Sequence, residues 1–251
     1  MSQSLQKGIE ALMFLSSKRS AGATEIARAI NVNKSTAFRI MQTFLAFNMV
    51  EKSPETLCYK LGPAILKLSQ QYYSGLNAAN VSRPYMARIS ECFGESVHLC
   101  ALSNNSAVVV EQITAEGRLI VNAKIGEAEP LHCSSVGKCL LAYADGGKQQ
   151  KMLCEIEFKK HTENTITNET ALKTELNKIK ENGYAVDDCE LSEEIRCVGV
   201  PVFNGKGECA FSIGVSGAKS RMTREKVFKI ASALKKVSEA ISSELGCTKV
   251  K

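Results

Sequence analysis

Residues 24–53 read TEIARAINVNKSTAFRIMQTFLAFNMVEKS, and this stretch decides the fold of the N-terminal third. The spacing of its apolar residues predicts two short helices separated by a turn at Asn31-Val32-Asn33. We expect the second helix to run from Asn33 or Ser35, either of which offers a capping side chain, to about Asn48. Its inward face holds Ala37, Ile40, Met41, Phe44 and Leu45, and its outward face holds Lys34, Ser35, Thr36, Arg39 and Gln42. A solvated surface helix has this pattern, and so does a helix that lies against phosphates and base edges.

The flanks of this stretch complete a small helical domain with a hairpin. Residues 5–15 have helical spacing and end at the polar turn 16–22, after which Thr24 offers an N-cap for the next helix. Strand-like runs at 49–52 and 57–61 enclose a turn at Ser53-Pro54-Glu55. These features predict a helix-turn-helix followed by a two-stranded wing, an arrangement that puts the second helix of the pair into a major groove.

Positive charge is concentrated in the same region. Residues 1–70 contain nine Lys/Arg and four acidic residues, whereas the whole chain carries a formal net charge of +6. Five of these six charges therefore belong to the first 70 residues. A basic N-terminal third beside a near-neutral remainder favours a nucleic-acid-binding module joined to a second domain.

Composition limits the remaining classes. With 251 residues, 44% apolar, the chain is long enough for one large or two small domains. It has neither an apolar run long enough for a membrane span nor a signal-peptide pattern at its start, so we expect no membrane association and a cytoplasmic location. The ten cysteines make up about 4% of the chain, below the ~8–10% of disulfide scaffolds. Without a Cys-x-x-Cys pair, most of them are expected to be reduced core residues.

The second half interleaves strands and helices. Residues 65–73 suggest a connecting helix, 75–81 a break, and the next helix is expected to start near Pro84 and end before Gly94. Further strands are expected at 96–102, 107–113, 118–123, 195–203 and 209–215, and helices at 136–144, 169–181 and from Thr223 to about 245. Gly183 is placed to end the helix at 169–181. The pattern predicts an α+β fold around a largely antiparallel sheet, with domains at 1–75 and 76–251.

Four blocks of sequence now carry a family resemblance. They are the stretch 24–53 with its wing ending in YKLG, then PLHCSSVGKCLLAY at 130–143, NGYAVDDCELSEEIRCVGVPVFN at 182–204, and SIGVSG at 212–217. Their order and spacing resemble the IclR family of bacterial transcriptional regulators over essentially the whole chain. The resemblance implies a winged helix-turn-helix joined by a helix to a GAF-like effector-binding domain. It also implies homodimers or homotetramers, with operator binding modulated by a small metabolite and repression as the expected output.

The resemblance also implies site residues. For double-stranded operator DNA, we expect contacts from Thr24, Lys34, Ser35, Thr36, Arg39, Lys52 and Lys60. The effector pocket of the family falls on Ser135, Val136, Gly137, Asp187, Ile195, Cys197, Gly214 and Ser216. Amides at the start of the helix near Val136 suit a carboxylate, which favours a keto acid or a sugar acid. Family members that read two- and three-carbon acids carry a second serine where this chain has Gly214.

Other interpretations remain open at this point. Asp187 could cap a turn, and Cys197 could be a buried strand residue without a ligand. His132 with Cys133 and Cys139 could hold a metal or act as a nucleophile and base, and a metal could also occupy the region of His132, Asp187 and Cys197. The alternative function is a redox- or metal-sensing regulator that uses Cys133, Cys139 and Cys197. A third class, an enzyme, predicts turnover, but no orienting third group stands at a recognisable spacing. We therefore expect no catalytic residues, no metal and no cofactor.

Overall fold

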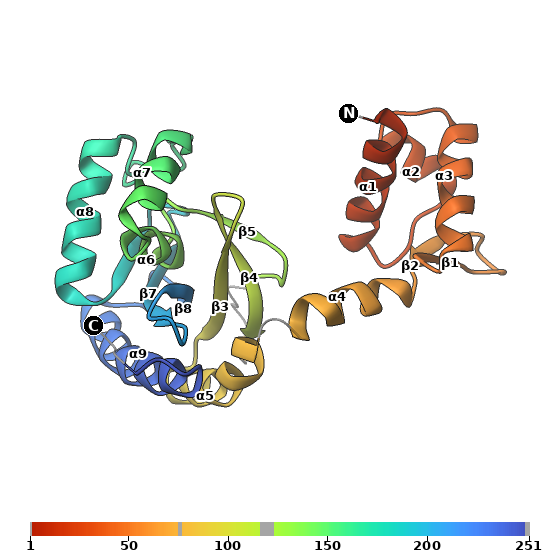
Figure 1. Ribbon diagram of the computed structural model, residues 1–251. Helices are drawn as coiled ribbons and strands as arrows, with labels where there is room; N and C mark the ends of the chain where they lie inside the picture. The colour runs from red at the N-terminus through yellow and green to blue at the C-terminus, as the bar shows by residue number, and fades with distance from the viewer. Residues whose placement is uncertain (1, 75–76, 116–122, 249–251) are drawn as a thin grey trace. The chain divides into compact units, whose positions relative to one another are not determined.

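The computed structural model of the 251-residue chain describes residues 2–74, 77–115 and 123–248. The chain divides into two compact units, Met1–Leu76 and Asn77–Lys251, which are described here one at a time (Figure 1). The boundary expected between 75 and 76 falls outside the described residues. The strand expected at 118–123 also lies outside them, except for its last residue.

The N-terminal unit is a winged helix-turn-helix. Its helices are α1 (Gln3–Ser16), α2 (Ala23–Ala29), α3 (Lys34–Ala46) and α4 (Ala64–Ser74), and its wing pairs β1 (Val50–Lys52) with β2 (Tyr59–Leu61) in antiparallel register. Asn33 caps α3, because its side chain accepts a hydrogen bond from the Thr36 amide. The core joins α1, α2 and α3 to the wing through Ala11, Leu15, Ala21, Ile26, Ile30, Met41, Val50 and Tyr59. The apolar period of the sequence therefore produces the predicted motif.

Two details of the helix starts were predicted wrongly. Helix α2 begins at Ala23 after the N-cap Gly22, which has no side-chain bond, so Thr24 lies inside the first turn and is not the cap. Helix α5 (Asn77–Phe93) begins well before Pro84, which lies inside it. Burial explains this continuity, because Ala78, Ser82, Met86 and Ile89 form one buried helical face that packs on the sheet and outweighs the cost of an internal proline.

The C-terminal unit is built on a six-stranded sheet with the order β5-β4-β3-β8-β7-β6. The strands are β3 (Ser96–Ser103), β4 (Ser106–Ile113), β5 (Ala128–Pro130), β6 (Ala185–Asp188), β7 (Ile195–Phe203) and β8 (Cys209–Ala218). All five neighbouring pairs are antiparallel. Asn104 and Asn105 turn β3 into β4 in the left-handed region, with φ of 45° and 57°. The predicted α+β class is confirmed.

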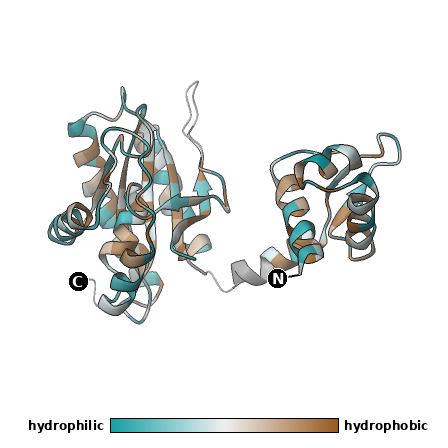
Figure 2. Ribbon diagram, turned by 90° about the horizontal axis from the view of Figure 1, so that it is seen from above, coloured by the Kyte–Doolittle hydropathy of each residue, from teal (hydrophilic) through white to brown (hydrophobic). Residues whose placement is uncertain are grey.

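Helices cover both faces of this sheet. Helix α6 (Ser135–Ala142) packs on one face against β7 and β8, with α7 (Gly146–Glu155) and α8 (Glu169–Asn182) beyond it (Figure 1). Helices α5 and α9 (Arg224–Glu244) cover the other face, and α9 is capped by Thr223 as expected. Figure 2 shows apolar residues on the helix faces that meet the sheet and polar residues on the opposite faces. The sequence analysis missed β5, β6 and α7, which are short or carry little apolar period.

Two predictions made from composition, on membrane spans and on the state of the cysteines, can be compared with the structure. No helix among the described residues is both long and apolar enough to span a membrane. No disulfide links the ten cysteines, which all lie in described segments, and six of them are buried.

Candidate DNA interface and candidate effector site

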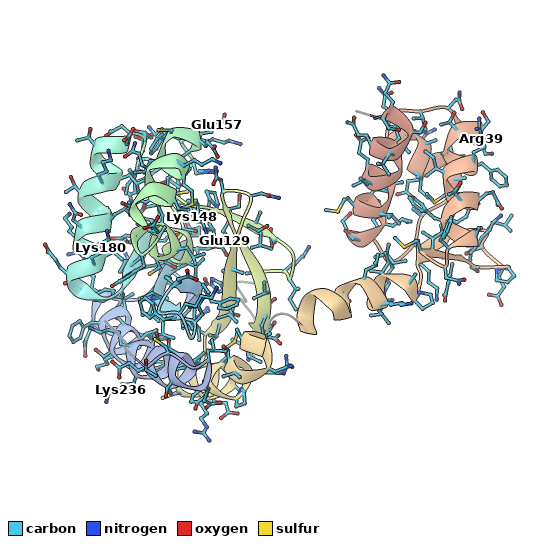
Figure 3. The ribbon with its side chains drawn as sticks, viewed as in Figure 1. Arg39, Glu129, Lys148, Glu157, Lys180 and Lys236 are labelled. Carbon is cyan, nitrogen blue, oxygen red and sulfur yellow. The ribbon has the colours of Figure 1, made fainter. Side chains whose placement is uncertain are left out.

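Helix α3 presents a polar face to solvent. Lys34, Ser35, Arg39 and Gln42 are exposed, whereas Ala37 and Met41 are completely buried on the opposite side. The side chain of Arg39 points outward from α3 (Figure 3). Within the described residues, neither Lys34 nor Arg39 forms an ion pair, so both charges are available to an anionic partner. Of the other expected DNA contacts, Thr24 is exposed on α2 and Thr36 is half-buried on α3.

Phe38 is a residue of this face that the sequence analysis did not select. Its side chain is 44% exposed although it is large and apolar. The Nζ of Lys52, on the wing, lies 5.9 Å from the centre of the Phe38 ring and 5.4 Å from that of Tyr59. Lys52 is thus held against two aromatic rings by cation–π attraction. The signal that could have identified Phe38 is its position, because it directly precedes Arg39 on the outward side.

The wing is attached to the helical part of the unit. Ala21, in the turn between α1 and α2, pairs with Tyr59, and the two residues exchange backbone hydrogen bonds of 2.9 and 2.8 Å. The buried Tyr59 ring sits in the same core as α3. On the wing surface, Lys60 Nζ lies 2.9 Å from Glu51 Oε2, and both side chains are about half exposed. Such an exposed pair is weak, so it leaves Lys60 free to exchange Glu51 for a phosphate.

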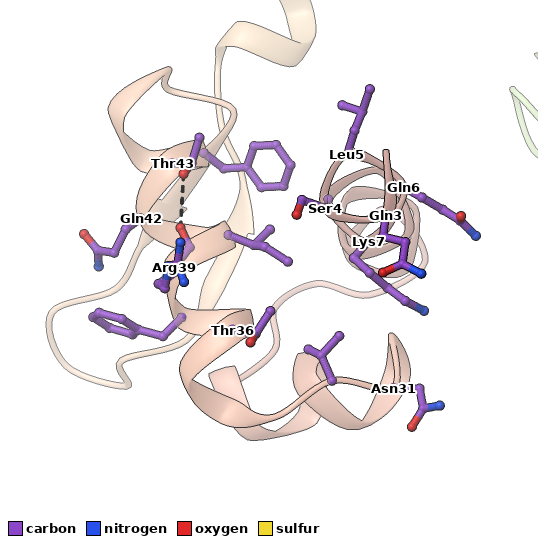
Figure 4. A pocket seen from close by; sticks show the side chains of 15 residues that line it. Gln3, Ser4, Leu5, Gln6, Lys7, Asn31, Thr36, Arg39, Gln42 and Thr43 are labelled. Carbon is purple, nitrogen blue, oxygen red and sulfur yellow. Dashed lines mark hydrogen bonds between the residues drawn. The ribbon is translucent and has the colours of Figure 1, made fainter. Parts of the chain in front are cut away.

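A groove of about 920 Å³ runs between the start of α1 and the flank of α3 (Figure 4). Gln3, Ser4 and Lys7 line it from α1, and Thr36, Arg39 and Thr43 line it from α3. Figure 4 shows Gln42 pointing away from α1. The flank of α3 is therefore open beside its outward face.

In the C-terminal unit, the sheet register brings together the expected effector residues. Asp187 on β6 pairs with Cys197 on β7, Cys197 pairs with Ser216 on β8, and Ser216 pairs with Ser96 on β3. Paired residues of an antiparallel sheet share a face, so these side chains form a row across four strands. Ile195, two residues before Cys197 on β7, lies on the same face and is half-buried.

The start of α6 lies over this face of the sheet. A Cβ atom added to Gly199, two residues beyond Cys197 on β7, would lie 3.1 Å from both the Ser135 carbonyl carbon and the Val136 nitrogen. The Ser135 hydroxyl is buried and has no hydrogen-bond partner among the described residues. Gly137 differs from the expectation, because its amide already donates to the cap Ser134 Oγ at 3.1 Å. The Ser135 hydroxyl, at the positive end of α6, is therefore a candidate ligand-binding group, and the Gly137 amide is not.

Gly214 and His98 explain a departure from the family pattern. They pair across β8 and β3. A Cβ atom on Gly214 would lie 2.7 Å from Val136 Cγ1 and 3.0 Å from His98 Nε2, so these two side chains occupy the space that a serine would need. His98 is 2% exposed, and its Nε2 has no hydrogen-bond partner in the described parts of the chain. His98 was not among the expected site residues, because its only signal is its position on a strand of the face that carries Ser216 and Cys197.

A buried ion pair joins α6 to the turn after β6. Lys138 is completely buried, and its Nζ donates to Val186 O at 2.6 Å and to Glu190 Oε1. Asp187 Oδ1 accepts from the Glu190 amide at 2.6 Å, and burial raises the pKa of Asp187 to about 7. Burial also raises the pKa of Glu190, although Lys138 opposes that shift. Asp187 therefore caps a turn. Its carboxyl, whose pKa is raised toward neutral pH, lies on the same face of the sheet as Cys197 and Ser216.

The buried cysteines are poor nucleophiles. Burial raises the pKa of Cys133 to about 12, with a further contribution from Asp187, and burial raises the pKa of Cys139 to about 12. The pKa of Cys197 is raised well above its ordinary value for the same reason. Thiols that stay protonated react slowly, which argues against the redox alternative.

In the described part of the chain, two groups of side chains have ligand atoms close enough to surround a cation. They are His132 with Cys133 and His161, and His98 with Cys100 and Glu129, each within 4.8 Å. Among the described residues, the expected grouping of His132 with Asp187 and Cys197 is not one of these sets. His132 Nε2 hydrogen-bonds the Lys159 carbonyl at 3.0 Å, and burial lowers the pKa of His132.

A winged helix-turn-helix in one unit and a row of buried polar side chains across the sheet of the other are typical of one class of protein, the ligand-responsive transcriptional regulators. Residues 4–54 match the family model described as the IclR helix-turn-helix domain, and residues 70–243 match that of the bacterial transcriptional regulator IclR C-terminal domain. The chain therefore belongs to the IclR family, whose members are DNA-binding transcriptional regulators with an effector-binding C-terminal domain, and not enzymes.

Individual relatives extend the match over nearly the whole chain. The transcriptional regulator KdgR of Escherichia coli K12 is 29% identical over 235 residues, which are 94% of this chain and 89% of KdgR. The repressor YiaJ of the same organism is 28% identical, covering 98% of this chain and 89% of YiaJ. The crystal structure of Thermotoga maritima IclR aligns with a TM-score of 0.82 at 29% identity, covering 96% of this chain and 98% of the other. A Microbacterium hydrocarbonoxydans homologue complexed with 4-hydroxybenzoate shares the fold, with a TM-score of 0.83 at 19% identity and coverage of 96% and 98%.

Proposed function

We propose that the chain is a repressor that binds operator DNA through α3 and releases it in response to a small anionic metabolite. The observation that carries the first part is the division of α3 between a buried face, with Ala37 and Met41, and an exposed face with unpaired Lys34 and Arg39. Ser35, Thr36 and Gln42 add hydrogen-bonding groups on or beside the exposed face. Such a helix matches the donor and acceptor pattern of a major groove.

A dimer suits this role, because two copies of α3 can then enter successive major grooves about 34 Å apart. Lys52 and Lys60 on the wing would contact flanking phosphates, and Thr24 at the start of α2 lies where a helix-turn-helix meets the backbone. Pairing of dimers into tetramers would add two further copies of α3 for DNA binding. A protein with this role acts on the chromosome and therefore in the cytoplasm.

The effector site is proposed on the face of the sheet beneath α6. The unpartnered Ser135 hydroxyl and the positive end of α6 suit a carboxylate, and Ser216 and Asp187 can bond hydroxyl groups of a keto acid or sugar acid. Val136, Gly214, Cys197 and Ile195 supply the walls of the pocket. The effector changes operator affinity only if it binds the DNA-free arrangement of the protein more tightly than the DNA-bound one.

Operator binding is tested by selecting duplexes from a random pool with the full-length protein and measuring their affinity. Arg39→Ala should weaken binding to the selected duplex about 5- to 150-fold, since it removes a charged base or phosphate contact worth about 1–3 kcal/mol. Lys18→Ala is the matched control, because Lys18 is also exposed but precedes α2 and is paired with Glu25. Equal affinity of wild type and Arg39→Ala would refute the assignment of α3.

The effector site is tested by thermal shift of the full-length chain with a panel of small carboxylates and sugar acids. Ser135→Ala should reduce the shift that a hit produces and should leave operator affinity without ligand unchanged. A hit whose shift is the same in wild type and Ser135→Ala binds elsewhere and would contradict the proposed site. The redox alternative has no observation in its favour.

A further inference from the structure

We propose that Phe38 determines part of the operator sequence by placing its ring against the C5-methyl group of a thymine in the major groove. The inference deepens the proposed operator binding and rests on it. It predicts that each half-site carries a thymine at one fixed place beside the bases that the polar residues of α3 contact.

The first step is that Phe38 does not belong to the core of its unit. Its side chain is 44% exposed, whereas its neighbour Ala37 and the next inward residue, Met41, are fully buried. One helical turn away on either side, Ser35 and Gln42 are exposed polar residues. A large apolar group therefore stands in the middle of the face that the proposed function gives to DNA, where it would be covered only in a complex.

The second step is that Phe38 is held in place before any duplex arrives. The turn that carries it is fixed at its start, because Asn33 Oδ1 accepts from the Thr36 amide at 2.8 Å and from Ser35 Oγ at 2.8 Å. The ring also has Lys52 Nζ 5.9 Å from its centre. A positioned side chain loses less conformational entropy on binding than a mobile one, so its contact contributes more to affinity.

The third step is chemical. A phenyl ring neither donates nor accepts a hydrogen bond, so it gains nothing at the polar edges of guanine, cytosine or adenine and nothing at a phosphate. Thymine is the base that presents an apolar group, its C5-methyl, in the major groove. Covering the methyl group and the ring together removes apolar surface of both partners from water. Thymine is therefore the base that complements Phe38.

The test uses deoxyuridine, which lacks this methyl group but pairs as thymine does. In a duplex selected by the wild-type protein, each thymine is replaced singly by deoxyuridine, and the dissociation constant is measured for wild type, Phe38→Ala and Phe38→Leu. At one position per half-site, deoxyuridine should weaken wild-type binding about three- to tenfold. For Phe38→Ala, deoxyuridine at that position should weaken binding by less than about twofold. For Phe38→Leu, the factor should lie between those of Phe38→Ala and wild type.

Phe47→Ala is the matched control, because Phe47 is 70% exposed but follows the last turn of α3. Deoxyuridine at the same position should weaken the binding of Phe47→Ala as much as it weakens that of wild type. The inference would be overturned if deoxyuridine weakened the binding of wild type and of Phe38→Ala equally at every thymine. It would also be overturned by a Phe38→Ala variant that binds all duplexes equally weakly and sediments as a smaller species, since Phe38 would then belong to a contact between subunits. If the wild-type protein selects no duplex, operator binding itself fails, and that outcome is distinct from the others.

Discussion

The ammonium group of Lys138 and the carboxylate of Glu190 form an ion pair inside the C-terminal unit, where Lys138 is completely buried and the Glu190 side chain is 9% exposed. The pair links α6, which carries Ser135, to the turn after β6, which carries Asp187. A charge at such depth is tolerated because its partner and the Val186 carbonyl replace water. The pair therefore fixes the two sides of the proposed pocket relative to each other.

Lys138→Met should be strongly destabilising, because it leaves the Glu190 carboxylate buried without its partner. We expect a loss of about 3–5 kcal/mol in the free energy of unfolding, and a recovery of most of that loss in Lys138→Met/Glu190→Gln. Lys173→Met, which breaks the exposed pair with Glu169, is the control and should cost less than about 0.5 kcal/mol. Urea unfolding at neutral pH measures all three variants. A single Lys138→Met variant as stable as wild type would show that the pair does not support the fold.

Gly214→Ser should destabilise the C-terminal unit, although serine is small. The added Cβ would meet Val136 Cγ1 at 2.7 Å and His98 Nε2 at 3.0 Å, so the strand or the helix must shift, at a cost of about 1–3 kcal/mol. Adding Val136→Ala should restore part of the lost stability by making room. Gly147→Ser is the control, since its nearest neighbour atom in the described chain would be 3.6 Å away. Equal melting temperatures for wild type and Gly214→Ser would mean that the pocket is looser than these distances indicate.

Asp187→Asn should change how stability depends on pH. The pKa of Asp187 rises from 3.8 to about 7 on folding, so the folded state holds its proton more tightly than the unfolded state. Its contribution to stability is therefore fully present below pH 4 and is lost as the pH rises toward and through 7. Between pH 5 and pH 8, wild type should lose about 2–3 kcal/mol relative to Asp187→Asn. Parallel stability curves for the two proteins over this range would place the pKa of Asp187 near its ordinary value.

Lys60→Ala should lower affinity for all duplexes alike and reduce the salt dependence of binding. Removing one phosphate contact decreases the slope of log affinity against log salt by about 1. Glu51→Ala is the informative partner variant, because it frees Lys60 from its 2.9 Å ion pair and should keep the wild-type slope. The slopes are measured by titrating wild type and both variants with duplex at several salt concentrations. A Lys60→Ala slope equal to that of wild type would remove Lys60 from the phosphate contacts.

Local patterns of sequence were sufficient for much of the fold. Thr223 was predicted as the start of α9, and Asn33 was one of the two caps expected for α3, because each depends on a few adjacent residues. Thr24 and Pro84 were misread for the opposite reason: Gly22 and the packing of α5 on the sheet decided where those helices begin.

The exposed face of α3 was predictable, because the apolar spacing within the helix itself separates it from the buried face. Lys138, Glu190 and His98 were missed because their roles arise from contacts across 48 or more positions, or across neighbouring strands. For instance, the bond from Lys138 to Val186 joins α6 to β6. Phe38 was assigned to neither face of α3 in the sequence analysis, although its position between Ala37 and Arg39 leaves it exposed.

The pairing of Ala21 with Tyr59 has a consequence for regulation. It fastens the wing to the turn before α2, so the wing and the helices of this unit are coupled. Under the proposed function, a metabolite would then change operator affinity through the spacing between the two N-terminal units of a dimer, with each unit still contacting the same bases.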